Sequence, residues 1–262
     1  MIDKLLTALL LISFSVQSAA QTDGTLNHTD KEGRKQGMWI KNYPGGNIMY
    51  RGFFRNDQPA GEFRRYYEDG SIQSVMSFSS DGKEAEAVIY YPNGFVASKG
   101  KYINQKKDGK WQFFSGLTQN SLISEEEYTM GKKNGLSLNF YSDSTIAEKI
   151  SYKNGLKHGE CLKYHNSGAL NLKTSYVNGR LNGTFEAYYE NGNPEFSGNY
   201  VNDLKDGKWK IYNEDGSLKF EINFVAGIPE NRELDIYETE YIDSLEKTRA
   251  EIPDPEKTGE IW

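Results

Sequence analysis

The chain has few residues of the types that catalytic and metal sites need. Its 262 residues include one cysteine, Cys161, and three histidines, His28, His158 and His165. A single cysteine excludes an intramolecular disulfide, and one cysteine with three scattered histidines supplies no ligand set for a transition metal. None of the histidines is paired with a nucleophile or a spaced carboxylate, as triad or general-base chemistry requires. We therefore expect no catalytic residues, no metal site and no enzyme activity.

Basic runs are also missing. The formal net charge is −6 at pH 7, so the release of counterions that drives binding to nucleic acids or acidic membranes has no evident source. The glycines match no phosphate-binding pattern followed by a helix, and the acidic residues match no calcium loop. The one acidic concentration, Glu125 to Glu127, is expected to be a solvated strand face. We therefore expect no nucleic-acid partner and no cofactor.

The one long apolar stretch lies at the N-terminus. Lys4 precedes the 12 residues from Leu5 to Val16, and Ser18-Ala19-Ala20 offers small residues for cleavage before Gln21. This order is typical of a secretory signal peptide, residues 1–20, and the stretch is shorter than the roughly 20 residues that span a bilayer. The alternative is an N-terminal anchor that stays attached. The prediction is an exported protein, periplasmic or extracellular, without a stable membrane span after signal removal.

The rest of the chain is dominated by an internal repeat of 24 residues. A small anchor residue opens each of eight units, and the spacings are 24, 24, 24, 26, 24, 24 and 24 residues. The eight anchors are Gly37, Gly61, Ala85, Gly109, Gly135, Gly159, Gly183 and Gly207. A fixed period in this range is the signature of an array of like supersecondary units. A residue that recurs in all eight units is better explained by a role in the fold than by a role in catalysis.

Each unit is predicted to be a β-hairpin. Turn pairs such as Asn93-Gly94 and Asp215-Gly216 follow a Tyr- and Phe-rich segment, and such pairs favour two-residue hairpin turns. The second strand alternates apolar and polar residues, which is typical of a half-buried antiparallel strand. Two residues past the anchor stands an aromatic such as Trp111 or Trp209, or one of the smaller substitutes Ala87, Ser137 and Cys161, so this position is expected to be core.

Eight such hairpins predict an all-β fold, an elongated, twisted antiparallel array in which each unit contacts its neighbours. An amphipathic pattern, with Leu234, Tyr237, Tyr241 and Leu245 at helical spacing, predicts a capping α-helix over residues 231–251. The expected domains are the signal peptide at 1–20, a polar lead-in at 21–35, the repeat domain at 36–230, this helix, and a loose tail at 252–262.

A second aromatic row is the candidate site. The positions five and six residues past the anchor are both often aromatic, and neighbouring residues of a strand face opposite sides of a sheet. If the sixth positions pack into the core, the fifth positions form a ladder on the other face, which is either structural or a partner-binding strip. This strip consists of Tyr66, Tyr90, Phe114, Phe140, Tyr164, Tyr188 and Tyr212.

Several segments of this repeat resemble a known family of repeats. Asp108-Gly109-Lys110-Trp111, Asp206-Gly207-Lys208-Trp209 and the returning Tyr-x-Asn-Gly of residues 152–155 and 176–179 resemble the variant MORN repeat. With its lead-in, the chain over residues 27–250 is similar to exported Bacteroidetes-type proteins called YwqK-family antitoxins. That resemblance implies no catalytic residues.

The function expected from these observations is that of a non-catalytic, exported repeat protein. It would act as a protein-interaction or envelope scaffold, with a protein or cell-envelope partner. The alternative is an antitoxin or immunity protein that uses the same surface to neutralise a partner toxin.

Overall fold

A computed structural model describes residues 25–230 and Glu240. The described chain is folded into eighteen strands. In order they are β1 (His28–Thr29), β2 (Lys35–Asn42), β3 (Ile48–Arg55), β4 (Gln58–Tyr66), β5 (Ile72–Phe78), β6 (Glu84–Tyr90), β7 (Val96–Ile103), β8 (Lys106–Phe114), β9 (Leu122–Thr129), β10 (Lys132–Phe140), β11 (Ile146–Lys153), β12 (Leu156–Tyr164), β13 (Leu170–Val177), β14 (Arg180–Tyr188), β15 (Pro194–Val201), β16 (Leu204–Tyr212), β17 (Leu218–Val225) and β18 (Ile228–Pro229).

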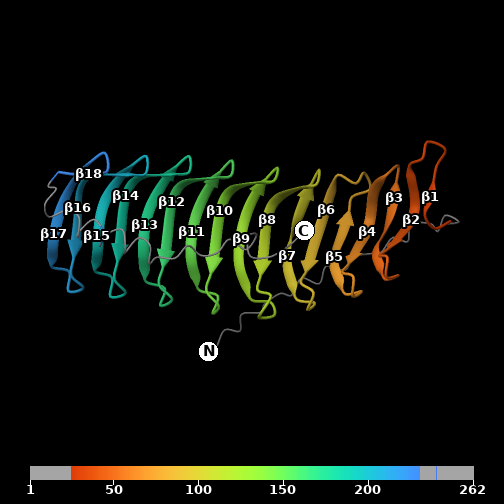
Figure 1. The fold of residues 1–262 in the computed structure, drawn as a ribbon, viewed down its shortest axis with the longest axis horizontal. Coiled ribbons are helices and arrows are strands. Elements are labelled where there is room, and N and C mark those ends of the chain that lie inside the picture. The colour runs from red at the N-terminus through yellow and green to blue at the C-terminus, as the bar shows by residue number, and fades with distance from the viewer. Residues whose placement is uncertain (1–24, 231–239, 241–262) are drawn as a thin grey trace, which may run out of the picture.

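Each strand pairs antiparallel with the next one along the chain, from β1 to β18. The result is one elongated, twisted sheet in sequence order (Figure 1). Each repeat supplies one hairpin, beginning with β2–β3 and ending with β16–β17, and the short strands β1 and β18 flank the eight hairpins. The predicted array of antiparallel hairpins is confirmed.

The prediction of a C-terminal capping helix as part of the fold was wrong. Every element of residues 25–230 is a strand, and β18, paired with β17 through Val225 and Ile228, follows the last hairpin. Apart from Glu240, the residues assigned to that helix, 231–251, lie outside the described residues, as do the predicted signal peptide and tail.

The anchor glycines mark irregularities between successive hairpins. At Gly109 and Gly207, φ is 68° and 67°, a backbone conformation that L side chains rarely adopt. The pairing register shifts beside these residues, as in a β-bulge, which increases the local twist. Ala85 replaces the anchor glycine in the third unit, and there β5 pairs with β6 without a shift. From the second unit on, the glycine anchor and the register shift therefore occur together.

The aromatic core lies on one face of the sheet, which we call the inner face. The side chains of Trp111 and Trp209 are fully buried. Trp111 belongs to an apolar cluster in the third and fourth units, and Trp209 to a second cluster in the sixth to eighth units. Cys161 is buried at the equivalent position in the sixth unit. The prediction that this position is core is confirmed for both tryptophans and for the cysteine.

Side-chain size alternates along the row that holds these residues. Phe63 pairs with Gly52 across the β3–β4 junction, whereas the small Ala87 and Cys161 pair with the larger Met76 and Ile150. A large side chain on one strand thus meets a small one on its neighbour. This complementarity lets the rings of Phe63, Trp111 and Trp209 approach a glycine of the preceding strand closely, as in the close packing typical of protein interiors.

Tyrosine hydroxyls connect successive hairpins. Tyr43 Oη donates a hydrogen bond of 2.8 Å to the carbonyl oxygen of Tyr66, and Tyr141 Oη donates one of 2.7 Å to the carbonyl oxygen of Tyr164. Tyr67, Tyr91 and Tyr189 make the same bond, each to a residue 23 positions later. We call these bonds the tyrosine rungs. They fix the backbone at the predicted aromatic strip.

Candidate interaction surface

The seven residues of the predicted strip occupy one repeated position beside the hairpin turn. Each is half-buried, and each pairs directly with an aliphatic residue or proline on the other strand of its hairpin. The pairs are Tyr66–Ile72, Tyr90–Val96, Phe114–Leu122, Phe140–Ile146, Tyr164–Leu170, Tyr188–Pro194 and Tyr212–Leu218. By alternation along the first strand of each hairpin, the seven aromatic residues lie on the face opposite the core aromatics, which we call the outer face. We call the row of pairs the aromatic strip.

The strip combines exposed apolar area with a fixed backbone. Ile72, Ile146 and Leu218 are 36, 39 and 52% exposed, although each stands next to an aromatic ring. The carbonyl groups of five strip residues accept the tyrosine rungs from the preceding hairpin: Tyr66, Tyr90, Phe114, Tyr164 and Tyr212. An apolar surface held in one conformation loses little entropy when a partner covers it.

The strip widens in the fifth and sixth units. Leu136 and Leu138 on β10 and Leu162 on β12 are half-buried and lie on the same face as Phe140 and Tyr164, two and four residues away along the strands. At the position of Leu138 the second unit has Arg64, the fourth Gln112 and the eighth Lys210. Apolar side chains therefore extend the strip at β10–β13.

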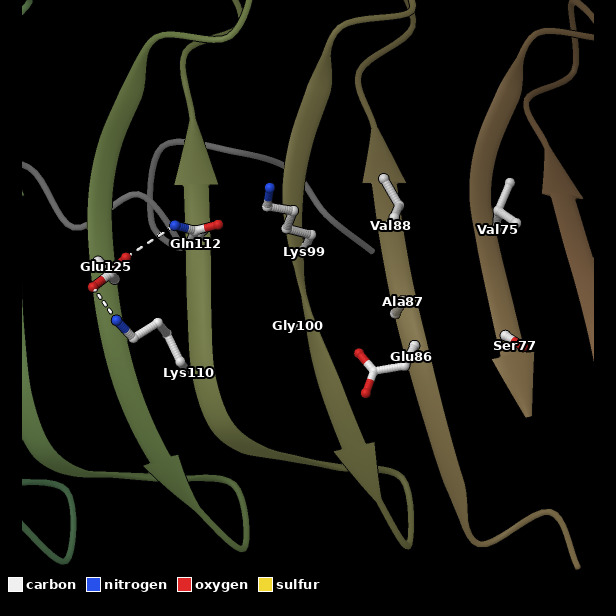
Figure 2. A pocket seen from close by; sticks show the side chains of 10 residues that line it. All are labelled: Val75, Ser77, Glu86, Ala87, Val88, Lys99, Gly100, Lys110, Gln112 and Glu125. Carbon is white, nitrogen blue, oxygen red and sulfur yellow. Dashed lines mark hydrogen bonds and ion pairs between the residues drawn. The ribbon is translucent and has the colours of Figure 1, made fainter. Parts of the chain in front are cut away.

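A groove lined by charged, polar and small apolar residues adjoins the strip over β5–β9. Figure 2 shows its residues, which line a hollow of about 450 Å³. Lys110 Nζ and Gln112 Nε2 donate hydrogen bonds of 2.6 and 2.9 Å to the carboxylate of Glu125. The hydrogen bond from Lys110 is the main cause that lowers the pKa of Glu125. Lys99 Nζ lies 5.3 Å from the centre of the Phe114 ring, which joins this groove to the strip.

The acidic run does not form the solvated face that the sequence suggested. Glu125 belongs to the groove, and Glu127 is exposed on the same face. Glu126 points to the inner face and is 1% exposed. Its carboxylate accepts hydrogen bonds of 2.5 Å from Tyr128 Oη and 2.8 Å from Lys133 Nζ. The expectation was wrong for Glu126, since strand alternation buries the middle residue of the three.

His28 lies on β1, whereas His158 lies within β12 and His165 directly follows that strand. His28 is exposed on β1, and His158 Nδ1 accepts a hydrogen bond of 3.4 Å from the Asn178 N–H. His165 takes the place of a rung tyrosine, and its Nε2 lies 3.1 Å from the Tyr188 carbonyl oxygen. Within residues 25–230 and at Glu240, no three His, Cys, Asp or Glu side chains are placed to hold a metal ion. That same part of the chain contains no helix long and apolar enough to cross a membrane.

Five segments of the chain match the family described as MORN repeat variant, at residues 60–79, 133–154, 157–178, 181–202 and 205–226. Each segment falls on one hairpin of the sheet, the first on β4–β5 and the last on β16–β17. The comparison with curated proteins found no match.

Proposed function

We propose that this MORN-repeat protein is a non-catalytic, exported scaffold that binds an extended segment of a partner protein along the aromatic strip. One observation supports the proposal above the others. Seven consecutive hairpins each present an aromatic ring beside an aliphatic residue or proline at the same outer-face position. Contiguous apolar surface with a polar rim is typical of protein-interaction sites, and tyrosine is enriched at binding hot spots.

An elongated occupant fits the dimensions of the strip. Neighbouring strands of a sheet are about 4.7–4.9 Å apart, so equivalent positions of successive hairpins are about 9.4–9.8 Å apart. Three residues of an extended chain cover about 10 Å. A segment that runs across the strands can therefore place every third side chain against one hairpin, which supports an extended peptide over a compact domain as the partner.

The test is a capture experiment with envelope and secreted fractions of the native organism. The bait variant Tyr164→Ser/Tyr188→Ser removes two neighbouring rings of the strip. The control variant Lys149→Ser/Lys173→Ser changes the same outer face beside the strip. We expect the first variant to bind a partner more weakly by about 2 kcal/mol or more, the range of an interface hot spot. The control variant should bind it as tightly as the unchanged chain does.

Equal recovery of the partner by the two folded variants would remove the strip as the binding site. A toxin among the captured proteins would turn the proposal into the antitoxin alternative. Export has its own test, because N-terminal sequencing of secreted or periplasmic protein should begin at Gln21. An intact Met1 on membrane-bound protein would contradict cleavage.

A further inference from the structure

A second hollow, of about 520 Å³, lies on the inner face around the β5–β6 junction, away from the aromatic strip. Its lining includes Phe78, Tyr102 and Tyr128 together with Lys83, Lys106 and Lys107. We infer that it binds a small amphipathic anion, with an apolar or aromatic body that carries a phosphate or carboxylate group. The inference is independent of the proposed scaffold function, since it concerns the opposite face of the sheet.

The hollow exists because a ring is missing from the core row. In the second unit, the Phe63 ring lies between Phe54 and Phe78, with ring centres 5.8 and 6.2 Å away. In the fourth unit, the Trp111 ring lies 4.8 Å from Tyr102. The third unit has Ala87 at this position. The space between Phe78 and Tyr102, which a ring fills at the equivalent place in the second and fourth units, is therefore left open.

The backbone of the same junction is also irregular. The turn from β5 to β6 runs over residues 79–83, whereas only two residues separate β3 from β4. The Gly82 N–H donates to the Ser79 carbonyl oxygen at 3.0 Å, within the turn itself. At the next turn, the Asn104 N–H instead donates a hydrogen bond of 2.7 Å to the backbone carbonyl oxygen of Lys83, in the preceding hairpin. A longer turn and an unshifted register together accompany the hollow.

The charge of the lining selects an anion. Three of its eleven residues are lysines, and none of the described residues that line it is acidic, in a chain whose net charge is −6. Lys107 Nζ lies 4.8–5.1 Å from the centres of the Phe113, Trp111 and Tyr128 rings. Lys83 is paired with Asp81 at 3.6 Å, but both side chains are more than half exposed, and such pairs are weak and easily exchanged.

The apolar part of the lining selects the body of the ligand. The hollow falls within the range of about 300–1,000 Å³ that is usual for small-molecule sites. Met76, Phe78 and the two tyrosines offer an aromatic and thioether surface on which a flat ring can stack. A ligand that places its ring there and its anion toward Lys83 and Lys106 satisfies both parts of the lining.

The test is calorimetric titration of the whole chain with 1-naphthyl phosphate, 1-naphthol and inorganic phosphate. The first probe carries both ring and anion, and the others carry one each. We expect one 1-naphthyl phosphate per chain, bound at least tenfold more tightly than either other probe. Lys83→Met/Lys106→Met should weaken 1-naphthyl phosphate at least tenfold and leave 1-naphthol unchanged. Lys132→Met, at the position of Lys106 in the next unit, should change neither.

A second variant tests the location of the site. Met76→Gly/Ala87→Trp builds the large and small pair of the other units, and its new ring should fill the hollow and abolish binding of 1-naphthyl phosphate and 1-naphthol alike. If that variant does not fold, the lysine variants decide. Equal affinity for the phosphate ester and 1-naphthol, or an equal loss in Lys132→Met, would overturn the inference. The chain could instead pellet with anionic phospholipid vesicles in a manner that depends on Lys106, while it fails to bind 1-naphthyl phosphate. That result would overturn the inference in favour of a membrane surface as the ligand.

Discussion

The ring of Trp111 lies directly over Gly100 on the preceding strand. A Cβ atom built on Gly100 would stand 2.5 Å from the Cδ2 and Cε2 atoms of that ring, and both atoms belong to a fully buried side chain. Gly198 and Trp209 repeat this relationship near the C-terminal end of the array. The row of core aromatics therefore needs glycines, which let the rings approach the neighbouring strand closely, as well as the rings themselves, which supply the buried apolar area.

Gly100→Ala should therefore destabilise the protein. The added methyl group must displace the Trp111 ring, and overpacking of this kind costs about 1–3 kcal/mol. Chemical denaturation of the variant measures the loss. Gly45→Ala is the control, since a Cβ there meets nothing within 4 Å. Equal stability of the two variants would contradict the contact.

Removal of a tyrosine rung should loosen one junction of the array. Tyr141→Phe deletes the 2.7 Å hydrogen bond to the Tyr164 carbonyl oxygen and keeps the ring. Loss of one such bond costs about 0.5–1.5 kcal/mol, and the effect should stay local because each unit contacts mainly its neighbours. Hydrogen exchange should show faster exchange around β10–β13. Tyr164→Phe is the matched control, and protection that falls evenly along the whole sheet would count against local rungs.

The buried ion pair of the fourth and fifth units should be sensitive to the loss of one partner. Lys133→Met leaves the Glu126 carboxylate, 1% exposed, without its 2.8 Å ion pair. Removal of one partner of a buried ion pair costs about 3–5 kcal/mol. The double variant Lys133→Met/Glu126→Gln should recover part of that loss in thermal or chemical unfolding. No recovery would mean that the lysine stabilises the sheet by its contacts with rings alone.

Cys161 should be unreactive in the folded protein. Burial raises the pKa of its thiol to about 12, so the reactive thiolate is scarce at neutral pH. We expect iodoacetamide to leave the native chain unmodified and to alkylate it once in denaturant, as mass spectrometry would detect. Rapid alkylation without denaturant would show that β12 opens readily.

Acid should weaken the N-terminal end of the array. Burial opposes ionisation of Asp30, but hydrogen bonds from Gln36 and Arg34 outweigh it and lower the pKa to about 2 from 3.8. Because the folded-state pKa is the lower one, Asp30 stabilises the fold above pH 3.8 and loses this contribution as the pH falls toward 2. Unfolding followed between pH 5 and 2 should show a smaller decline for Asp30→Asn than for the natural chain. Identical pH profiles would contradict the assignment.

The repeat could be predicted from the sequence because its signals are local. The turn pairs such as Asn93-Gly94 and the aromatic periodicity specify each hairpin, and one unit can be compared with the next. The core role of Trp111 and the half-buried position of Tyr164 both follow from strand alternation. The same rule applied to residues 125–127 would have placed Glu126 on the inner face, but charge alone suggested solvent.

Other features could be found only in the three-dimensional structure. The tyrosine rungs join residues 23 positions apart, and nothing in a single hairpin shows that Tyr141 reaches the next one. The hollow at β5–β6 arises from the combination of Ala85, Ala87 and a longer turn, each of which is unremarkable alone. The capping helix was predicted from amphipathic spacing, which reports a possible apolar face but contains no information about what covers it.

The constant offset of the tyrosine rungs limits how such a chain can change its length during evolution. Duplication or deletion of a whole unit keeps every hydroxyl opposite its carbonyl group, so the array can grow or shrink in steps of one hairpin. A shorter insertion breaks the correspondence where it falls. The two extra residues of the fourth unit coincide with Ser115, in place of tyrosine, at the rung position, as this limit predicts.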